Sequence, residues 1–188
     1  MFAPYEHLIQ IADKLEDVAR GDIKRLVINI FPRSGKTEMA VKLFIAWGLA
    51  LNQRSKFIHL SYSGDLALDN SATAKEYISS PAFQDIWKME LRIDSKAKQK
   101  WFNKKGGGCY ATSVNGQITG FGAGDSKKRS DVEDENPFKG FSGAIIIDDP
   151  NKPSDTFSDI ERNKVNQRYN NTIRSRVNNP RETPIIVI

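Results

Sequence analysis

Two short stretches hold the residues of this sequence that could do chemistry. The first ends in Gly35, Lys36 and Thr37, and an apolar run precedes it. Backbone N–H groups of such a loop can surround anionic oxygens, and the N-terminus of a following helix points at them. Lys36 would then reach the β- and γ-phosphates of a nucleotide, the Thr37 hydroxyl would bind Mg²⁺, and Gly35 would allow close backbone approach. A phosphate-binding loop usually has a glycine where this chain has Ile30.

The second stretch is AIIIDDP, in which four apolar residues end in Asp148 and Asp149. In nucleotide-hydrolysing sheets, the first acid at the end of a strand holds Mg²⁺, directly or through water. The next acid can polarise the attacking water. Two acids after a strand can also form a turn that caps the next segment, as Pro150 would encourage. The upstream loop favours the catalytic interpretation.

The residues around these stretches predict alternating helices and strands. Apolar positions recur with helical spacing in residues 5–19, and Gly21 should end that helix. The pattern predicts an α/β fold with a central, mostly parallel sheet and flanking helices. The expected strands are 24–31, which should be buried, 56–63, 141–150 and a last one from Pro184. The other expected helices are 36–51, 64–78 and 158–176.

The middle of the chain has a different pattern. Residues 100–122 alternate turn residues with short β-type runs, which predicts a small β insertion, with a hairpin at Asn115-Gly116. Residues 123–140 are polar, basic at the start and acidic at the end, and this composition predicts a mobile surface loop.

Bulk composition excludes several classes of protein. With 188 residues, 39% hydrophobic and 27% charged, the chain is typical of one soluble globular domain. No apolar run has the length of a membrane span, and the single cysteine, Cys109, permits no internal disulfide, which fits a reducing compartment. The net charge of +5 favours an anionic partner such as nucleic acid, although a mildly basic soluble protein explains it equally well.

Several segments together resemble the ATPase half of phage terminase large subunits, the motors that package double-stranded DNA into procapsids. The similarity spans nearly the whole chain and lies in NIFPRSGKTE, FIHLSYSGDLA, NGQITGFGAG, FSGAIIIDDPNKP and TIRSRVNN. The resemblance implies a RecA-like P-loop ATPase of the additional-strand class. Residues 1–188 would be a single N-terminal ATPase domain. The chain stops inside an apparent strand, so we expect it to be truncated, without the coupling motif and the C-terminal nuclease domain.

The resemblance also implies roles for individual residues. Arg33 would lie beside Lys36 near the γ-phosphate, and Asp149 would orient or activate water. Thr37 and Asp148 would hold Mg²⁺, and Glu6 and His7 would approach the adenine side. The residues expected to bind ATP are Pro32, Arg33, Ser34, Gly35, Lys36, Thr37 and Glu38.

The chain departs from the family at the arginine that acts on a neighbouring subunit. Many relatives have Gly-Arg-Gly where this chain has Gly120-Phe121-Gly122. Arg129 is the first substitute, with Lys127 and Lys128 beside it. A solvated loop explains residues 127–129 as well. Other candidates are Arg174 and Arg176.

The expected partners follow from the same resemblance. They are double-stranded DNA, other copies of the chain in a ring motor, the portal protein and the small terminase subunit. No membrane partner is expected, and the site of action would be the host cytoplasm, at the procapsid portal. Residues 98–105, KQKWFNKK, are the best basic patch for the DNA backbone, or else a solubilising turn. The expected function is ATP hydrolysis that powers DNA translocation, slow in an isolated domain and without DNA cleavage. Alternatives are a helicase-like ATPase, a non-hydrolysing nucleotide-binding scaffold and a small-molecule kinase.

Overall fold

The computed structural model describes residues 5–93, 97–125, 138, 140–155 and 157–188. These residues form a six-stranded sheet in the order β1-β6-β5-β2-β4-β3, and every neighbouring pair is parallel except β3 and β4. The expectation of an α/β fold with a mostly parallel sheet is therefore confirmed. The strands are β1 (Arg25–Val27), β2 (Lys56–Ser61), β3 (Lys100–Phe102), β4 (Gly108–Ser113), β5 (Ile145–Asp148) and β6 (Ile185–Val187).

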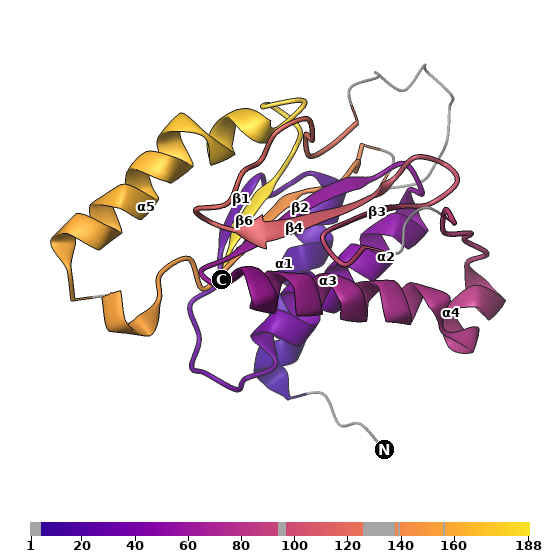
Figure 1. Ribbon diagram of the computed structural model, residues 1–188. Coiled ribbons are helices and arrows are strands. Elements are labelled where there is room, and N and C mark those ends of the chain that lie inside the picture. Colours follow the sequence, from indigo (N-terminus) through magenta and orange to yellow (C-terminus); the bar gives the residue numbers. More distant parts are fainter. Residues whose placement is uncertain (1–4, 94–96, 126–137, 139, 156) are drawn as a thin grey trace.

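Helices flank the sheet on both sides. Figure 1 shows α1, α2 and α3 together along one face, whereas α5 stands apart on the other side. No helix among the described residues combines the length and the apolar character that crossing a bilayer requires. The helices are α1 (Glu6–Arg20), α2 (Phe44–Leu51), α3 (Gly64–Ser79), α4 (Pro81–Ile86) and α5 (Asp159–Asn171), with a π-helix η1 (Glu38–Leu43) and two 3₁₀ turns, η2 (Pro153–Asp155) and η3 (Ile173–Arg176).

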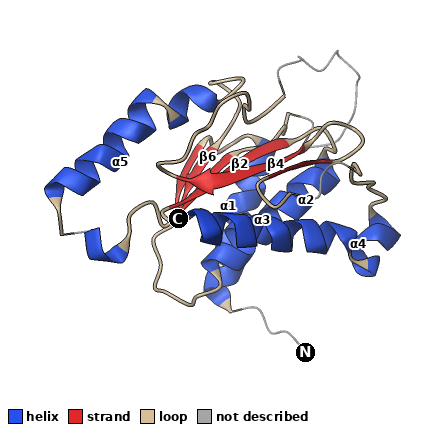
Figure 2. Cartoon of the chain, in the orientation of Figure 1, coloured by secondary structure: helices blue, strands red, loops and turns tan. Residues whose placement is uncertain are grey.

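The core has two layers because successive residues of a strand point to opposite faces of the sheet. On β5, Ile146 belongs to the layer beneath the helices α1, α2 and α3, whereas Ile145 and Ile147 belong to the layer on the opposite face. Helices and strands separate clearly in Figure 2, where the blue helices α1 to α3 line one side of the red strands. The opposite layer is completed by η3 and the segment 114–123, and α5 itself has no buried residue.

The strand expected at 24–31 is shorter and more exposed than the sequence predicts. Only Arg25 to Val27 are extended, and Val27 is 72% exposed. Among the described strands β1 pairs only with β6, so it lies at an edge of the sheet, with Arg25 and Val27 exposed and Leu26 half-buried. The apolar run that precedes the expected phosphate-binding loop is therefore an edge strand and not a central one.

The middle of the chain is part of the main sheet and not a separate insertion. β4 pairs with β2 in parallel, and β3 adds to it as an antiparallel edge. The expected hairpin at Asn115-Gly116 is wrong, because the reversal lies between β3 and β4. There the Asn103 side-chain oxygen accepts hydrogen bonds from the backbone N–H groups of Lys105 and Gly107, which closes the turn locally.

Two expected helices differ in detail from the sequence pattern. The helix expected at 36–51 is continuous in its path, but Glu38–Leu43 (η1) form a π-helix, and the α-helix α2 follows it. Single π turns inside helices occur often at functional sites. The helix expected at 158–176 ends at Asn171 and continues as the 3₁₀ turn η3.

Candidate functional site

The fold brings the two predicted motifs together at the carboxyl end of the parallel strands. The loop 28–37 follows β1 and leads into η1, and Asp148 is the last residue of β5. β6 lies between β1 and β5 in the sheet, so the loop must reach past β6 to meet the acids. It does so through two side-chain contacts, one from Lys36 and one from Thr37, each to a residue more than a hundred positions away in the sequence.

The first contact joins Thr37 to Asp148. The Thr37 hydroxyl donates a hydrogen bond of 2.9 Å to Oδ2 of Asp148. Asp148 is 5% exposed, and its other oxygen, Oδ1, is buried without a hydrogen-bond partner. Burial raises the pKa of Asp148, and the neighbouring Asp149 carboxylate adds to this, while the Thr37 hydrogen bond and the charge of Lys36 act in the opposite direction.

A buried carboxylate oxygen without a partner suits a divalent cation. Mg²⁺ is usually held by one or two protein groups and completes its shell with water and phosphate oxygens. The Thr37 hydroxyl and the Asp148 carboxylate supply such a pair, and a cation beside Asp148 would offset the cost of burying its charge. Among the described residues, there is no group of three or more acids, histidines or cysteines that could form an all-protein metal cage.

The second contact is an ion pair between Lys36 and Asp149. The Lys36 ammonium lies 2.8 Å from Oδ1 of Asp149. The Lys36 side chain is 15% exposed and the Asp149 side chain 51%. The backbone of Asp149 is held on both sides: its N–H donates to the Ile188 carbonyl, and its carbonyl accepts from the Tyr62 N–H.

The backbone is unusual at both motifs. In the described part of the chain only two non-glycine residues have positive φ, Arg33 at 62° and Asp149 at 44°. Such conformations are uncommon outside glycine and concentrate at functional sites. Gly35 has φ of 85°, so an L-residue there would be strained, and a side chain would also meet Leu8.

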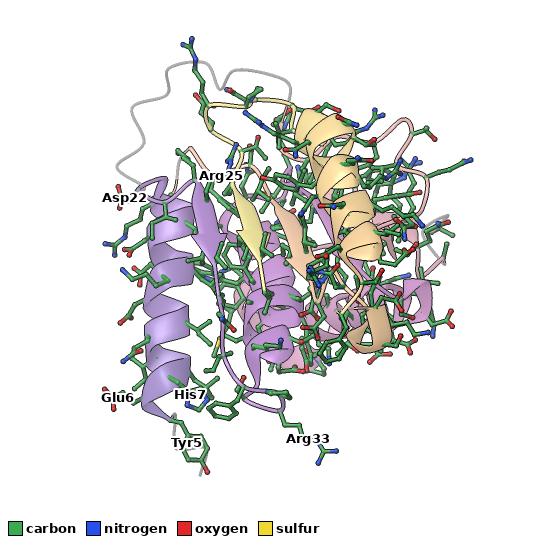
Figure 3. All side chains as sticks on the ribbon, turned by 90° about the vertical axis from the view of Figure 1, so that its left-hand side faces the viewer. Tyr5, Glu6, His7, Asp22, Arg25 and Arg33 are labelled. Atoms are coloured by element: carbon green, nitrogen blue, oxygen red, sulfur yellow. The ribbon has the colours of Figure 1, made fainter. Side chains whose placement is uncertain are left out.

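The loop residues differ in where their side chains lie. Ser34 is buried, and its hydroxyl has no partner, whereas Pro32 and Arg33 are exposed. Figure 3 shows Arg33 extending away from the body of the protein, at the opposite end from Arg25. The expected position of Arg33 near a γ-phosphate remains a prediction.

Glu38, the first residue of η1, is held in place by two side chains. Its carboxylate accepts hydrogen bonds from the Tyr77 hydroxyl on α3 and from Lys42, at 2.9 Å. Burial opposes ionisation of Glu38, but these two hydrogen bonds outweigh it and lower its pKa. The hydrogen bond from the Tyr77 hydroxyl to Glu38 also raises the pKa of Tyr77 to about 12. The loop motif indicated Glu38 but not Lys42 or Tyr77; the i,i+4 spacing of Glu38 and Lys42 was the available signal.

Aromatic rings lie beside the loop at the start of α1. The rings of Tyr5 and His7 stack with centroids 5.8 Å apart, and His7 meets Phe31 edge-on at 5.7 Å. Nε2 of His7 lies 2.9 Å from the Ser34 carbonyl, so this cluster is attached to the loop itself. Figure 3 shows Tyr5 and His7 at the same end of the molecule as Arg33. Of the expected pair, His7 contacts the loop, whereas Glu6 is exposed and accepts a hydrogen bond from Gln10, one turn along α1.

Of the candidates for an arginine that acts on a neighbouring subunit, the structure describes only Arg174 and Arg176, and neither belongs to this cluster. Arg129, Lys127 and Lys128 lie outside the described residues. Arg174 and Arg176 lie on η3, near the amino end of β2, whereas the loop lies at the carboxyl end of the strands. The Arg176 carbonyl accepts from Ala123 N–H, and the next residue, Gly124, donates to the Lys56 carbonyl at the start of β2.

Two of the four lysines in the basic patch at 98–105 are paired with neighbouring acids. Lys98 pairs with Asp69 at 3.1 Å, and Lys104 pairs with Glu90. The Lys100 ammonium lies over an aromatic ring, 5.6 Å from the centroid of Phe102. Of the two aromatic residues in this stretch, Trp101 is fully buried and Phe102 is half-buried.

Comparison of the sequence with protein-family models and with curated proteins finds no match to either. The site therefore rests on its own geometry. That geometry comprises a cation and a hydroxyl at the start of a helix and two acids at the end of a strand, joined by the contacts of Lys36 and Thr37.

Proposed function

We propose that this chain is a P-loop ATPase that hydrolyses ATP with Mg²⁺ at the carboxyl end of the sheet. The observation that carries the proposal is the pair of contacts, Lys36 with Asp149 and Thr37 with Asp148. They bring an ammonium group, a hydroxyl and two carboxylates close together, and these are the groups that a site for phosphate and Mg²⁺ would need. Phosphoryl transfer depends mainly on this kind of positioning and charge stabilisation.

The strand order supports the additional-strand class of such ATPases. β6 separates β1, which leads into the loop, from β5, which ends in the acids. In this proposal β6 is the additional strand, and the sheet is RecA-like. The aromatic cluster of Tyr5, His7 and Phe31 provides a surface beside the loop on which a purine ring could stack.

Each residue has a defined task in the proposed reaction. Thr37 and Asp148 would hold Mg²⁺, and the bound ion would neutralise phosphate charge. Lys36 would bind the phosphate oxygens as a point charge, and Arg33, on its strained backbone, would add a second cation. Asp149 would orient the attacking water and accept its proton. Backbone N–H groups around Gly35 would complete the phosphate cradle.

Phosphate release from ATP tests this proposal directly. We expect Mg²⁺-dependent release by the wild-type chain, and a loss of about 100-fold or more in both Lys36→Ala and Asp149→Asn, since each removes a charge that acts in the transition state. Lys14→Ala is the matched control, because Lys14 is an exposed lysine on α1 that pairs with Asp17. Wild-type rates in both site variants would contradict the proposal.

We further propose that hydrolysis drives translocation of double-stranded DNA, as the resemblance to terminase large subunits suggests. Ring assembly from several copies, and work at a procapsid portal with a small terminase subunit, belong to the same proposal. Stimulation of hydrolysis by duplex DNA is the expected result. Stimulation by single strands alone would favour a helicase-like ATPase, and nucleotide binding without phosphate release would favour a scaffold.

A further inference from the structure

The Lys36–Asp149 ion pair assigns a second task to Asp149. We propose that Asp149 is an internal counter-ion of Lys36 that the terminal phosphate of a nucleoside triphosphate must displace. This carboxylate would then be a specificity-determining residue that weakens nucleotide binding and acts mainly against triphosphates. The inference rests on the proposed function, because it concerns the same site.

The geometry makes Asp149 the partner that moves. Lys36 has little exposure, so its ammonium is confined, whereas half of the Asp149 side chain is exposed. The Asp149 backbone is fixed by hydrogen bonds to Ile188 and Tyr62, and its positive φ is one that aspartate tolerates better than most residues. Displacement therefore requires only a rotation of the carboxylate into solvent.

Electrostatics makes carboxylate and phosphate competitors. Both carry negative charge, and both would occupy the space within hydrogen-bonding distance of one ammonium group. Sharing Lys36 would place the phosphate and Asp149 close enough to repel each other, next to the already buried Asp148. Release of Asp149 relieves that repulsion and leaves its carboxylate free to accept a proton from water.

The competition should depend on the number of phosphates. The lysine of such a loop reaches the β- and γ-phosphates. A triphosphate places charge at both positions, so it must take over the contact that Asp149 makes. A diphosphate has no γ-phosphate, and Asp149 can keep part of its contact with Lys36. Asp149 thus lowers triphosphate affinity more than diphosphate affinity.

Nucleotide binding by calorimetry, with Mg²⁺ present, tests the inference without relying on turnover. The probes are ADP and a non-hydrolysable ATP analogue. Asp149→Asn and Asp149→Gly should each bind the analogue about two- to fivefold more tightly than the wild type, as expected for loss of a partly exposed ion pair. ADP affinity should change less. Asp149→Gly suits the positive φ, so it tests the same point if the Asn variant folds poorly.

Asp159→Asn is the matched control for loss of one negative charge, since Asp159 pairs with Arg162 on α5 and not with Lys36. Equal tightening in this control would attribute the effect to net charge and overturn the inference. Unchanged analogue affinity in both Asp149 variants would also overturn it and leave the ATPase proposal intact. Absence of nucleotide binding by the folded wild type would overturn both.

Discussion

The carboxyl end of the sheet and its β3–β4 edge use charged residues in opposite ways. At the carboxyl end, Lys36 and Thr37 contact acids that are distant in the sequence. One of these acids, Asp149, has a positive φ, and one carboxylate oxygen of the other, Asp148, is buried without a partner. At the β3–β4 edge, lysines pair with exposed acids or lie over rings.

Ligand binding and stability place different demands on polar groups. A site that binds ligands must keep polar groups only partly satisfied, and this reduces stability. At the edge, the buried Trp101 side chain adds stability, and two of the lysines already have acidic partners. Variants at the two regions should therefore affect different measurements.

The largest effect on stability is expected at the β3–β4 edge. Trp101 is fully buried, and its indole N–H donates a hydrogen bond of 2.8 Å to Ser71 on α3. Trp101→Ala should lower the free energy of unfolding by about 3–5 kcal/mol, because it leaves a large cavity in the core. Chemical denaturation measures this, with Trp87→Ala as control, since Trp87 is 39% exposed. An equal decrease in the free energy of unfolding in the two variants would show that Trp101 contributes no more to packing than the partly exposed Trp87.

A smaller effect on stability, but a clear effect on binding, is expected at the carboxyl end. Asp148→Asn should weaken Mg²⁺ binding at least about tenfold, because the amide lacks the charge that holds the cation. Titration of Mg²⁺ in the presence of ADP measures this. In the wild type, Mg²⁺ affinity should fall as the pH is lowered through the raised pKa of Asp148, since protonation removes the same charge.

The stability of Asp148→Asn should not fall near neutral pH. Because the pKa of Asp148 is raised in the folded protein, the unfolded chain loses this proton first as the pH increases. This carboxyl therefore costs stability above the unfolded pKa, and the cost is absent at lower pH. Thermal unfolding of wild type and variant across acidic and neutral pH measures it. A variant that is clearly less stable at neutral pH would make Asp148 a structural residue.

The smallest effect is expected for the basic patch. Lys98→Ala combined with Lys104→Ala should leave ATP hydrolysis unchanged and barely alter the unfolding temperature, because exposed ion pairs contribute little. Binding of duplex DNA at several salt concentrations provides a further readout. A large reduction in the salt dependence of that binding would show that these lysines contact phosphates despite their partners.

Much of the fold could be predicted because its signals are local. The positions of α1, β2, α3 and β5 follow from apolar spacing, and Gly21, with φ of 92°, ends α1 as expected. The hairpin was misplaced because Asn115-Gly116 is a turn signal in sequence, yet the reversal depends on side-chain hydrogen bonds of Asn103. The exposure of β1 could not be predicted, because an apolar run does not reveal how many neighbours a strand has.

For the candidate site too, some features follow from the sequence and others only from the tertiary structure. The sequence by itself determined which residues could bind phosphate and metal, since residue types and spacing within a loop or at a strand end are local properties. Only the tertiary structure decided that Lys36 meets Asp149 and Thr37 meets Asp148, across separations of 113 and 111 residues. Those contacts depend on the order of β1, β6 and β5 in the sheet, which no local pattern specifies. The fold likewise decided that Asp148 is buried and Asp149 exposed, and so gave adjacent, identical residues different environments.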